Sequence, residues 1–239
     1  MGGLRRFPNE LQYMYDEVLG TFVGSLGKMS KAIANFIEDM YQNGEIDDYT
    51  KDYLLSCPGR TSELYLLPKI HKPSFGQGNM PSRPIMSANG SPTEKISEFV
   101  DFFLNPTTFD LPAYVRDTTD FLRKLKQIGP LPKGTLLVTL DVESLYTNIP
   151  NDFGIRAARI TLLEKRNTPG IKPTNESLLK LLRLVLTSNN FSFNGSNFLQ
   201  VGSCTMGSKV SVGYANNRTL RRTTCIHIPG PTTHILEVH

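Results

Sequence analysis

Apolar residues recur at helical spacing in the first quarter of the chain. Apolar side chains around Ile37 fall three or four positions apart, and Gly44 is suited to end the helix they predict. Asp47 is a suitable cap for a short second helix. We therefore interpret residues 9–56 as helical, and the acidic residues between 38 and 52 as a solvated face of this region.

Four further helices are predicted on the same grounds. Ser91-Pro92-Thr93-Glu94 combines a cap, a proline and an acid in the order typical of a helix start. Asp117 caps the next helix and Gly129 ends it, a third helix covers about residues 153–166, and Thr174 caps the fourth. The side chains expected to face the core are Ile96, Phe99, Val100, Phe103 and Leu104 in the first of these helices, Phe121, Leu122, Leu125 and Ile128 in the second, and Leu178, Leu181, Leu182 and Val185 in the fourth.

Two β-hairpins are predicted between the helices. Residues 63–67 and 83–87 are short β-rich stretches separated by a glycine-containing turn. Residues 191–193 and 198–200 flank Asn194-Gly195, a strong signal for a tight hairpin turn. Helices and strands of this kind indicate an α+β fold.

A carboxylate stands at the end of an apolar run. Residues 136–140 read Leu-Leu-Val-Thr-Leu and lead directly to Asp141. A buried strand can hold a side chain rigidly at its end, and an acid there is costly unless it is paired, hydrogen-bonded or bound to a metal. Two interpretations stay open: Asp141 is an oxygen ligand for Mg²⁺, or it caps the turn after the strand.

Cations gather in two places. Lys69 and Arg83 would lie on neighbouring strands of the first hairpin, where they either clamp a polyphosphate or are ordinary surface cations. Arg123, Lys124 and Lys126 lie off the apolar face of their helix, where they contact a nucleic-acid backbone or merely solvate the helix.

Composition gives limited information about the binding partners and the cellular compartment of this protein. The 239 residues carry a net charge of +4 with a pI near 8.9, which is compatible with nucleic-acid binding. The three cysteines stand far apart without the spacing of a zinc site, which indicates a reducing, intracellular compartment. We expect no signal peptide and no transmembrane segment, because no apolar run approaches the length needed to cross a bilayer.

A loop rich in glycine and small residues follows the second hairpin. Residues 202–209 are a near miss to a P-loop, but the final Lys and Ser/Thr are exchanged, and we reject that interpretation. Gly202 and Gly207 instead indicate a loop whose backbone is closely approached by something flat or bulky.

Taken together, these segments resemble the reverse transcriptases of Penelope-like retroelements, which are relatives of telomerase. The matching segments are collinear and cover about residues 30–216. They are Leu67-Pro68-Lys69-Ile70-His71-Lys72-Pro73, Arg83-Pro84-Ile85-Met86-Ser87, Ser91-Pro92-Thr93-Glu94, Leu140-Asp141-Val142-Glu143-Ser144-Leu145-Tyr146-Thr147-Asn148-Ile149-Pro150, Gln200-Val201-Gly202, Met206-Gly207 and Tyr214-Ala215-Asn216.

The resemblance implies a role for several residues. Asp141 is similar to the aspartate that binds both catalytic Mg²⁺ ions, and the carbonyl of Val142 would assist it. Tyr146 resembles the aromatic gate beneath the sugar of the incoming deoxynucleotide, although core packing is the other interpretation of this ring. Lys69 and Arg83 resemble the residues of the fingers that hold the triphosphate.

The resemblance extends to the glycine loop and to nucleic acid. Gln200 and Gly202 resemble the loop that packs against nucleotide and template, whereas an amide at the end of a hairpin is the alternative for Gln200. Lys72 joins the other cations as a candidate for nucleic-acid contact. The implied partners are an RNA template, a DNA primer and deoxynucleoside triphosphates, with no membrane partner, and the family suggests a nuclear location.

One element of the family pattern is missing. The family needs a Tyr-x-Asp-Asp turn after the glycine loop, yet no Asp-Asp pair follows Asp152, and Glu237 is the only acid after Glu176. One carboxylate seldom holds two Mg²⁺ ions, because Mg²⁺ demands near-octahedral oxygen ligation. We therefore expect a C-terminally truncated reverse-transcriptase domain that does not polymerise alone.

The expected organisation follows from these matches. Residues 1–60 form an N-terminal helical region, 61–216 form the fingers and a partial palm of a right-hand polymerase, and 217–239 form a disordered, unrelated tail. The partial palm is expected to be an incomplete antiparallel sheet packed with helices. Two alternatives to the polymerase fragment stay open: a non-catalytic nucleic-acid-binding remnant of a retroelement, and a helical scaffold.

Overall fold

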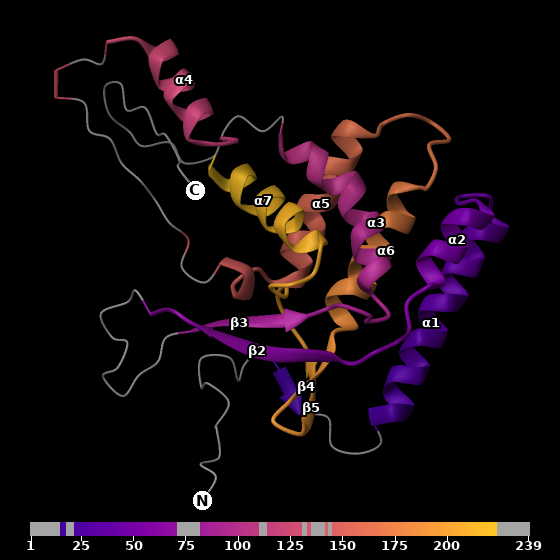
Figure 1. Ribbon diagram of the computed structural model, residues 1–239. Helices are drawn as coiled ribbons and strands as arrows, with labels where there is room; N and C mark the ends of the chain where they lie inside the picture. Colours follow the sequence, from indigo (N-terminus) through magenta and orange to yellow (C-terminus); the bar gives the residue numbers. More distant parts are fainter. Residues whose placement is uncertain are drawn as a thin grey trace, which may run out of the picture.

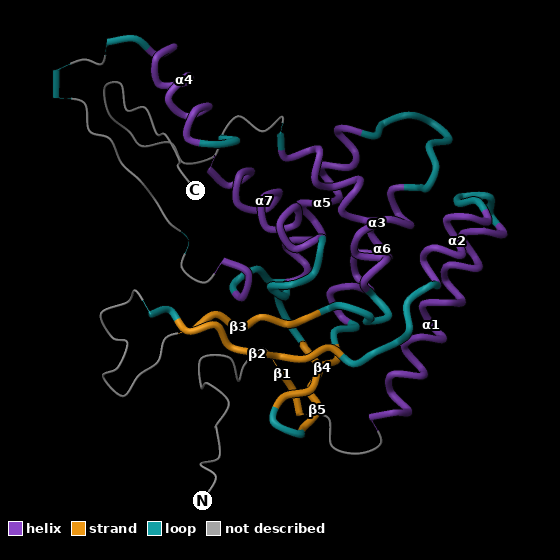
Figure 2. The backbone as a smooth tube through the Cα atoms, viewed as in Figure 1, coloured by secondary structure: helices purple, strands orange, loops and turns teal. Residues whose placement is uncertain are grey.

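The computed structural model describes residues 15–17, 22–70, 82–109, 114–130, 133–134, 142 and 145–223 (Figure 1). These segments contain both helices and strands (Figure 2). In chain order the elements are β1 (Tyr15–Glu17), α1 (Phe22–Gln42), α2 (Asp48–Leu55), β2 (Ser62–Pro68), β3 (Ser82–Ser87), α3 (Glu94–Leu104), the 3-10 helix η2 (Asn105–Thr108), α4 (Thr118–Ile128), the 3-10 helix η3 (Leu145–Thr147), α5 (Asn151–Lys165), α6 (Asn175–Thr187), β4 (Asn190–Phe193), β5 (Ser196–Gln200) and α7 (Val210–Thr223).

The described strands form one mixed sheet in the order β1-β5-β4-β2-β3. Neighbouring strands in this sheet are antiparallel, except that β2 and β4 run parallel to each other. Both predicted hairpins are present, with Leu67 opposite Arg83 in the first and Phe191 opposite Phe198 in the second. Asn194 and Gly195 both take positive φ values, as a tight hairpin turn requires. The α+β class is therefore confirmed.

Helices α3, α5, α6 and α7 pack together on one side of the sheet, and α1 and α2 flank them (Figure 1). The predicted core face of α6 is confirmed, because Leu178, Leu181, Leu182 and Val185 are all buried. The main core also takes apolar side chains from α1, α3, α5 and α7. A smaller cluster, formed by side chains of β2, β3 and β4, consists of Leu64, Met86 and Phe191. None of the described helices is long and apolar enough to cross a lipid bilayer.

The prediction that residues 9–56 are helical is wrong at one place. β1 pairs with the edge of β5, with Tyr15 opposite Gln200. An edge strand offers unpaired backbone groups, and pairing with them overrides the local helical pattern. Among the described residues of this region, α1 and α2 are helical as expected, and Asp47 caps α2 by accepting a hydrogen bond from the Thr50 backbone N–H at 2.8 Å.

Two further expectations are corrected. Helix α7 continues to Thr223, so residues 217–223 are not the unstructured tail that the sequence predicts. In α4, Leu122 is 50% exposed and Ile128 is 37% exposed, so these side chains do not face a core. The buried side chain of α4 is instead Asp120, whose carboxylate closes a polar network at the start of the helix.

Candidate nucleotide and nucleic-acid interface

Three distant segments meet at the glycine loop, residues 202–209. The Cys204 backbone N–H donates to the carbonyl oxygen of Tyr146 at 3.1 Å. The Met86 N–H donates to the carbonyl oxygen of Met206 at 2.9 Å. The glycine loop thereby connects η3 to β3, and it joins segments that the resemblance assigns to a single site.

The predicted close approach to the glycine loop occurs at Gly207. Its φ of +124° lies in a region that side chains disfavour, and a β-carbon there would stand 2.1 Å from the Met86 carbonyl oxygen. The approaching group is thus the backbone of β3. At Gly202, by contrast, a β-carbon would have no atom within 4 Å, so packing at this position does not require glycine.

The side chain of Gln200, the last residue of β5, is hydrogen-bonded to the backbone of the glycine loop. Its side chain is buried, and its Nε2 donates to the carbonyl oxygens of Gly202 at 2.8 Å and Ser203 at 3.1 Å. Its Oε1 accepts a hydrogen bond from Asn189 Nδ2 at 3.2 Å. Because both ends of the amide bond to the protein itself, Gln200 shapes the loop, as the hairpin-end interpretation expects.

Tyr146 is half-buried and packs against the main core. Burial raises the pKa of its phenol, and the neighbouring Cys204 adds to this effect. Cys204 is itself buried, which raises the pKa of its thiol to about 12, and its Sγ donates to Ser211 Oγ at 3.0 Å. The Tyr146 ring is therefore held by packing while part of it reaches the surface.

The two cations that the resemblance assigns to a triphosphate site, Lys69 and Arg83, lie at the same end of the first hairpin. Arg83 is exposed and faces Leu67 across the β2–β3 pair, and Lys69 follows directly after the last residue of β2. Neither cation has an ion-pair partner in the part of the chain that the structure describes. Unpaired cations at one end of a hairpin can neutralise an anionic ligand.

The metal prediction falls largely outside the described residues. Asp141 and Lys72 are not among them, and Val142 is 43% exposed. Within residues 15–17, 22–70, 82–109, 114–130, 133–134, 142 and 145–223, no three His, Cys, Asp or Glu side chains are grouped to hold an ion. Binding of Mg²⁺ at Asp141 stays a prediction.

The three cations of α4 are placed on one helix but differ in their contacts. Arg123 and Lys124 both pair with Asp120, the second at 3.3 Å. The Arg116 backbone N–H also donates to Asp120, and these bonds together lower the pKa of that carboxyl to about 2. Lys126 is exposed.

Sequence reasoning missed Asn217. Its fully buried amide accepts from Thr161 Oγ1 at 2.8 Å and Thr107 Oγ1 at 3.3 Å, and it donates to the carbonyl oxygens of Gly213 and Leu104. These bonds join α7 to α5 and to the junction of α3 with η2. A signal was present, because position 217 continues the helical spacing of Val210 and Tyr214.

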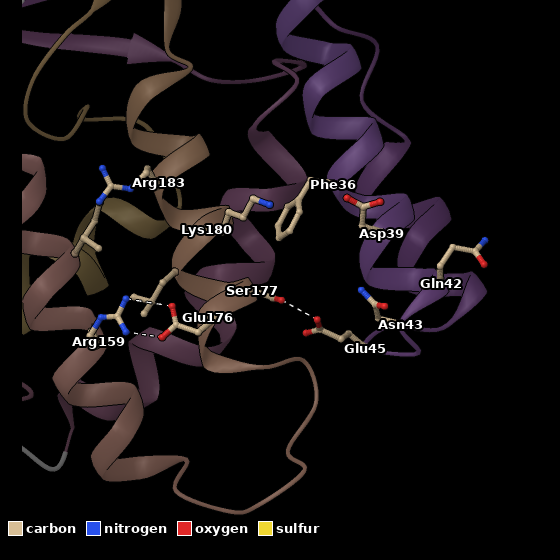
Figure 3. Close-up of a pocket in the computed structure, with 12 residues that line it drawn as sticks. Phe36, Asp39, Gln42, Asn43, Glu45, Arg159, Glu176, Ser177, Lys180 and Arg183 are labelled. Carbon is tan, nitrogen blue, oxygen red and sulfur yellow. Dashed lines mark hydrogen bonds and ion pairs between the residues drawn. The ribbon is translucent and has the colours of Figure 1, made fainter.

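A cavity of about 550 Å³ lies between α1 and α6, away from the predicted site residues (Figure 3). Several of its charged groups contact other lining residues. Arg159 forms a two-pronged pair with Glu176, Glu45 accepts from Ser177 Oγ at 2.8 Å, and Lys180 lies over the Phe36 ring at 3.9 Å. We interpret the polar contacts in this cavity as structural interactions that connect α1 to the core helices.

Comparison with protein-family models, with curated proteins and with solved structures finds no match.

Proposed function

We propose that this chain forms the fingers and part of the palm of a reverse transcriptase similar to those of Penelope-like retroelements. In this proposal it binds deoxynucleoside triphosphates and nucleic acid, and it does not polymerise by itself. One observation carries the proposal: the glycine loop is bonded to both Tyr146 and Met86, so three segments that resemble the family's nucleotide site are neighbours.

Each of these segments has a task that its chemistry suits. The guanidinium of Arg83 can grip a phosphate with two hydrogen bonds, and the Lys69 ammonium can neutralise a second phosphate oxygen. Tyr146, held by the core behind it, offers a firm surface beneath a sugar ring. Gln200 keeps the glycine loop in place without touching the ligand.

Catalysis by the family requires more than this binding surface. When bound, the Mg²⁺ pair of the family activates the primer 3′-oxygen and stabilises the leaving pyrophosphate. Asp141 resembles one ligand residue, but the 239 residues contain no Tyr-x-Asp-Asp turn. Primer extension on an RNA template with Mg²⁺ should therefore give no product, and product that depended on Asp141 would refute this part of the proposal.

Nucleotide binding tests the site directly. Lys69→Ala/Arg83→Ala should weaken the affinity for a fluorescent deoxynucleoside triphosphate by about tenfold or more, since each lost charged hydrogen bond costs about 1.5 kcal/mol or more. The matched control is Lys28→Ala/Arg183→Ala, which removes the same charge from exposed positions on α1 and α6. Equal losses in the two variants would show that net charge alone governs binding.

The second candidate function is a nucleic-acid-binding remnant of a retroelement. The exposed cations of α4 and the missing acidic turn favour it. Under this alternative the chain would bind RNA or DNA with a steep dependence on salt, and it would show no measurable affinity for deoxynucleoside triphosphates.

A further inference from the structure

Two aromatic rings form a pair beside the start of α4. The centroids of Phe109 and Tyr114 lie 5.2 Å apart with their planes tilted by 56°. Phe109 is 55% exposed, so part of its ring is open to solvent while Tyr114 supports the other part. An exposed ring that is held in place by a second ring suits the stacking of a nucleobase.

Lys124 contacts this aromatic pair, and further cations lie close to it in sequence or on the same helix. Lys124 Nζ donates to the Tyr114 carbonyl oxygen, which connects α4 to the pair. The Arg116 side chain is mostly exposed and lies two residues beyond Tyr114. Arg123 and Lys126 line a groove of about 450 Å³ along α4. We call Phe109, Tyr114, Arg116, Arg123, Lys124 and Lys126 the aromatic–basic surface.

The carboxylates of this region leave an excess of positive charge. Asp117 pairs with Arg116 at 2.9 Å, and Asp120 pairs with Arg123 and Lys124. Among the described residues of this region, four cations thus face two carboxylates. The acidic residues of α1 and α2 lie at the far side of the molecule from α4 (Figure 1), so they would not repel a polyanion bound here.

The groove along α4 is partly apolar. Leu122 contributes to it and is half-exposed, although an amphipathic helix ordinarily buries such a residue. Hydrogen bonds around Asp120 fix the first turn of α4, and the Leu122 side of the helix is accessible. A groove lined by an apolar side chain and two cations suits both bases and phosphates.

We propose that the aromatic–basic surface binds single-stranded nucleic acid, with one base stacked on Phe109 and phosphates at Arg116, Arg123 and Lys126. The proposal deepens the nucleic-acid binding proposed above and rests on it. A duplex would bind less tightly, because its bases are stacked on one another and present no free face to Phe109.

The test is fluorescence anisotropy with a labelled oligo(dT) and an oligo(U) of equal length, alongside the matching duplexes. Phe109→Ala should weaken single-strand binding by about tenfold, since one stacked base contributes about 1–3 kcal/mol, and should leave the salt dependence unchanged. Phe102→Ala is the matched control, because this ring on α3 is 72% exposed yet lies outside the surface. It should bind like the parent chain.

The cations have a different expected signature. Arg123→Gln/Lys126→Gln should reduce the slope of log affinity against log salt by about 1.4, the contribution of two phosphate contacts to a single strand. Lys126→Gln alone should give about half of this change, and it leaves the Asp120 network intact if the double variant folds poorly.

Three results would overturn the proposal. They are equal losses in Phe109→Ala and Phe102→Ala, duplex binding as tight as single-strand binding, and binding to phosphatidylserine vesicles without binding to either oligonucleotide. Nucleotide binding through Lys69 and Arg83 is measured separately, so failure at the aromatic–basic surface would leave that site standing.

Discussion

Gly154 in α5 lies directly against the phenol of Tyr214 in α7. A β-carbon on Gly154 would stand 1.9 Å from the phenol oxygen and 2.0 Å from the carbon that bears it. Tyr214 is fully buried, so its ring has little room to retreat. The contact lets α5 and α7 approach closely beside the loop that carries the candidate site.

Substituting Gly154 therefore tests how tightly the two helices are packed. Gly154→Ala should lower the free energy of unfolding by about 3 kcal/mol in urea titrations, because overpacking displaces a buried ring. Gly27→Ala in α1, where a β-carbon has no atom within 4 Å, should instead raise it by about 0.5–1 kcal/mol. Similar midpoints for both variants would mean that the helices are free to separate.

The glycine loop offers a second matched pair. Gly207→Ala should destabilise the protein by about 2 kcal/mol or more, because it imposes both a strained φ and a clash with the Met86 carbonyl. Gly202→Ala should change the unfolding free energy by less than about 0.5 kcal/mol. Hydrogen exchange at the Met86 amide would report loss of its bond to Met206, and unchanged protection in Gly207→Ala would contradict the prediction.

Asn217 should be far more sensitive than its neighbour. Asn217→Ala leaves the Leu104 carbonyl and two threonine hydroxyls without their buried amide, and we expect a loss of about 3 kcal/mol in thermal or urea unfolding. Asn216→Ala, at a half-buried position, should cost less than about 1 kcal/mol. Equal effects would show that the order in α7 ends before residue 217.

Asp101 should make stability depend on pH. Burial raises the pKa of its carboxyl to about 6, despite the attraction of Lys209, and its Oδ1 is buried without a hydrogen bond among the described residues. The folded-state pKa exceeds the ordinary value of 3.8, so the folded state binds the proton more tightly than the unfolded state. Protonation of Asp101 therefore stabilises the folded protein fully below about pH 4, and this stabilisation is lost as pH rises through 6.

Asp101→Asn removes this titration. The variant should be more stable than the parent chain at pH 7.5, with a smaller difference at pH 4.5, in urea midpoints measured at both values. Asp52→Asn, an exposed carboxylate on α2, serves as the control. A parent chain that gains stability between pH 4.5 and 7.5 relative to Asp101→Asn would contradict the assigned direction.

Local chemistry was a reliable guide where partners are close in sequence. Asp47, Asp117 and Thr174 cap their helices as predicted, because each accepts a hydrogen bond from a backbone N–H three residues on. Asn194-Gly195 turns its hairpin because both residues tolerate positive φ. The caps and the turn depend only on residues a few positions away along the chain.

The candidate site was predictable only in part. The neighbouring positions of Lys69 and Arg83 follow from the hairpin, and the close approach at Gly207 was expected, although not the group that makes it. The direction of the Gln200 amide depends on Asn189 and on the glycine loop, and neither contact has a signature in the spacing of residues.

By itself, the sequence determined the α+β class, both hairpins, the apolar face of α6 and the helix caps at Asp47, Asp117 and Thr174, whereas the cap predicted at Ser91 is wrong because α3 begins at Glu94 without a side-chain cap. Only the tertiary structure decided that Tyr15 pairs with β5, that Asn217 joins three helical segments, and that α4 turns Leu122 outward while burying Asp120. The reason is physical: caps and turns depend on neighbours a few residues away. An edge pairing or a buried amide depends on partners far along the chain, which periodicity does not reveal.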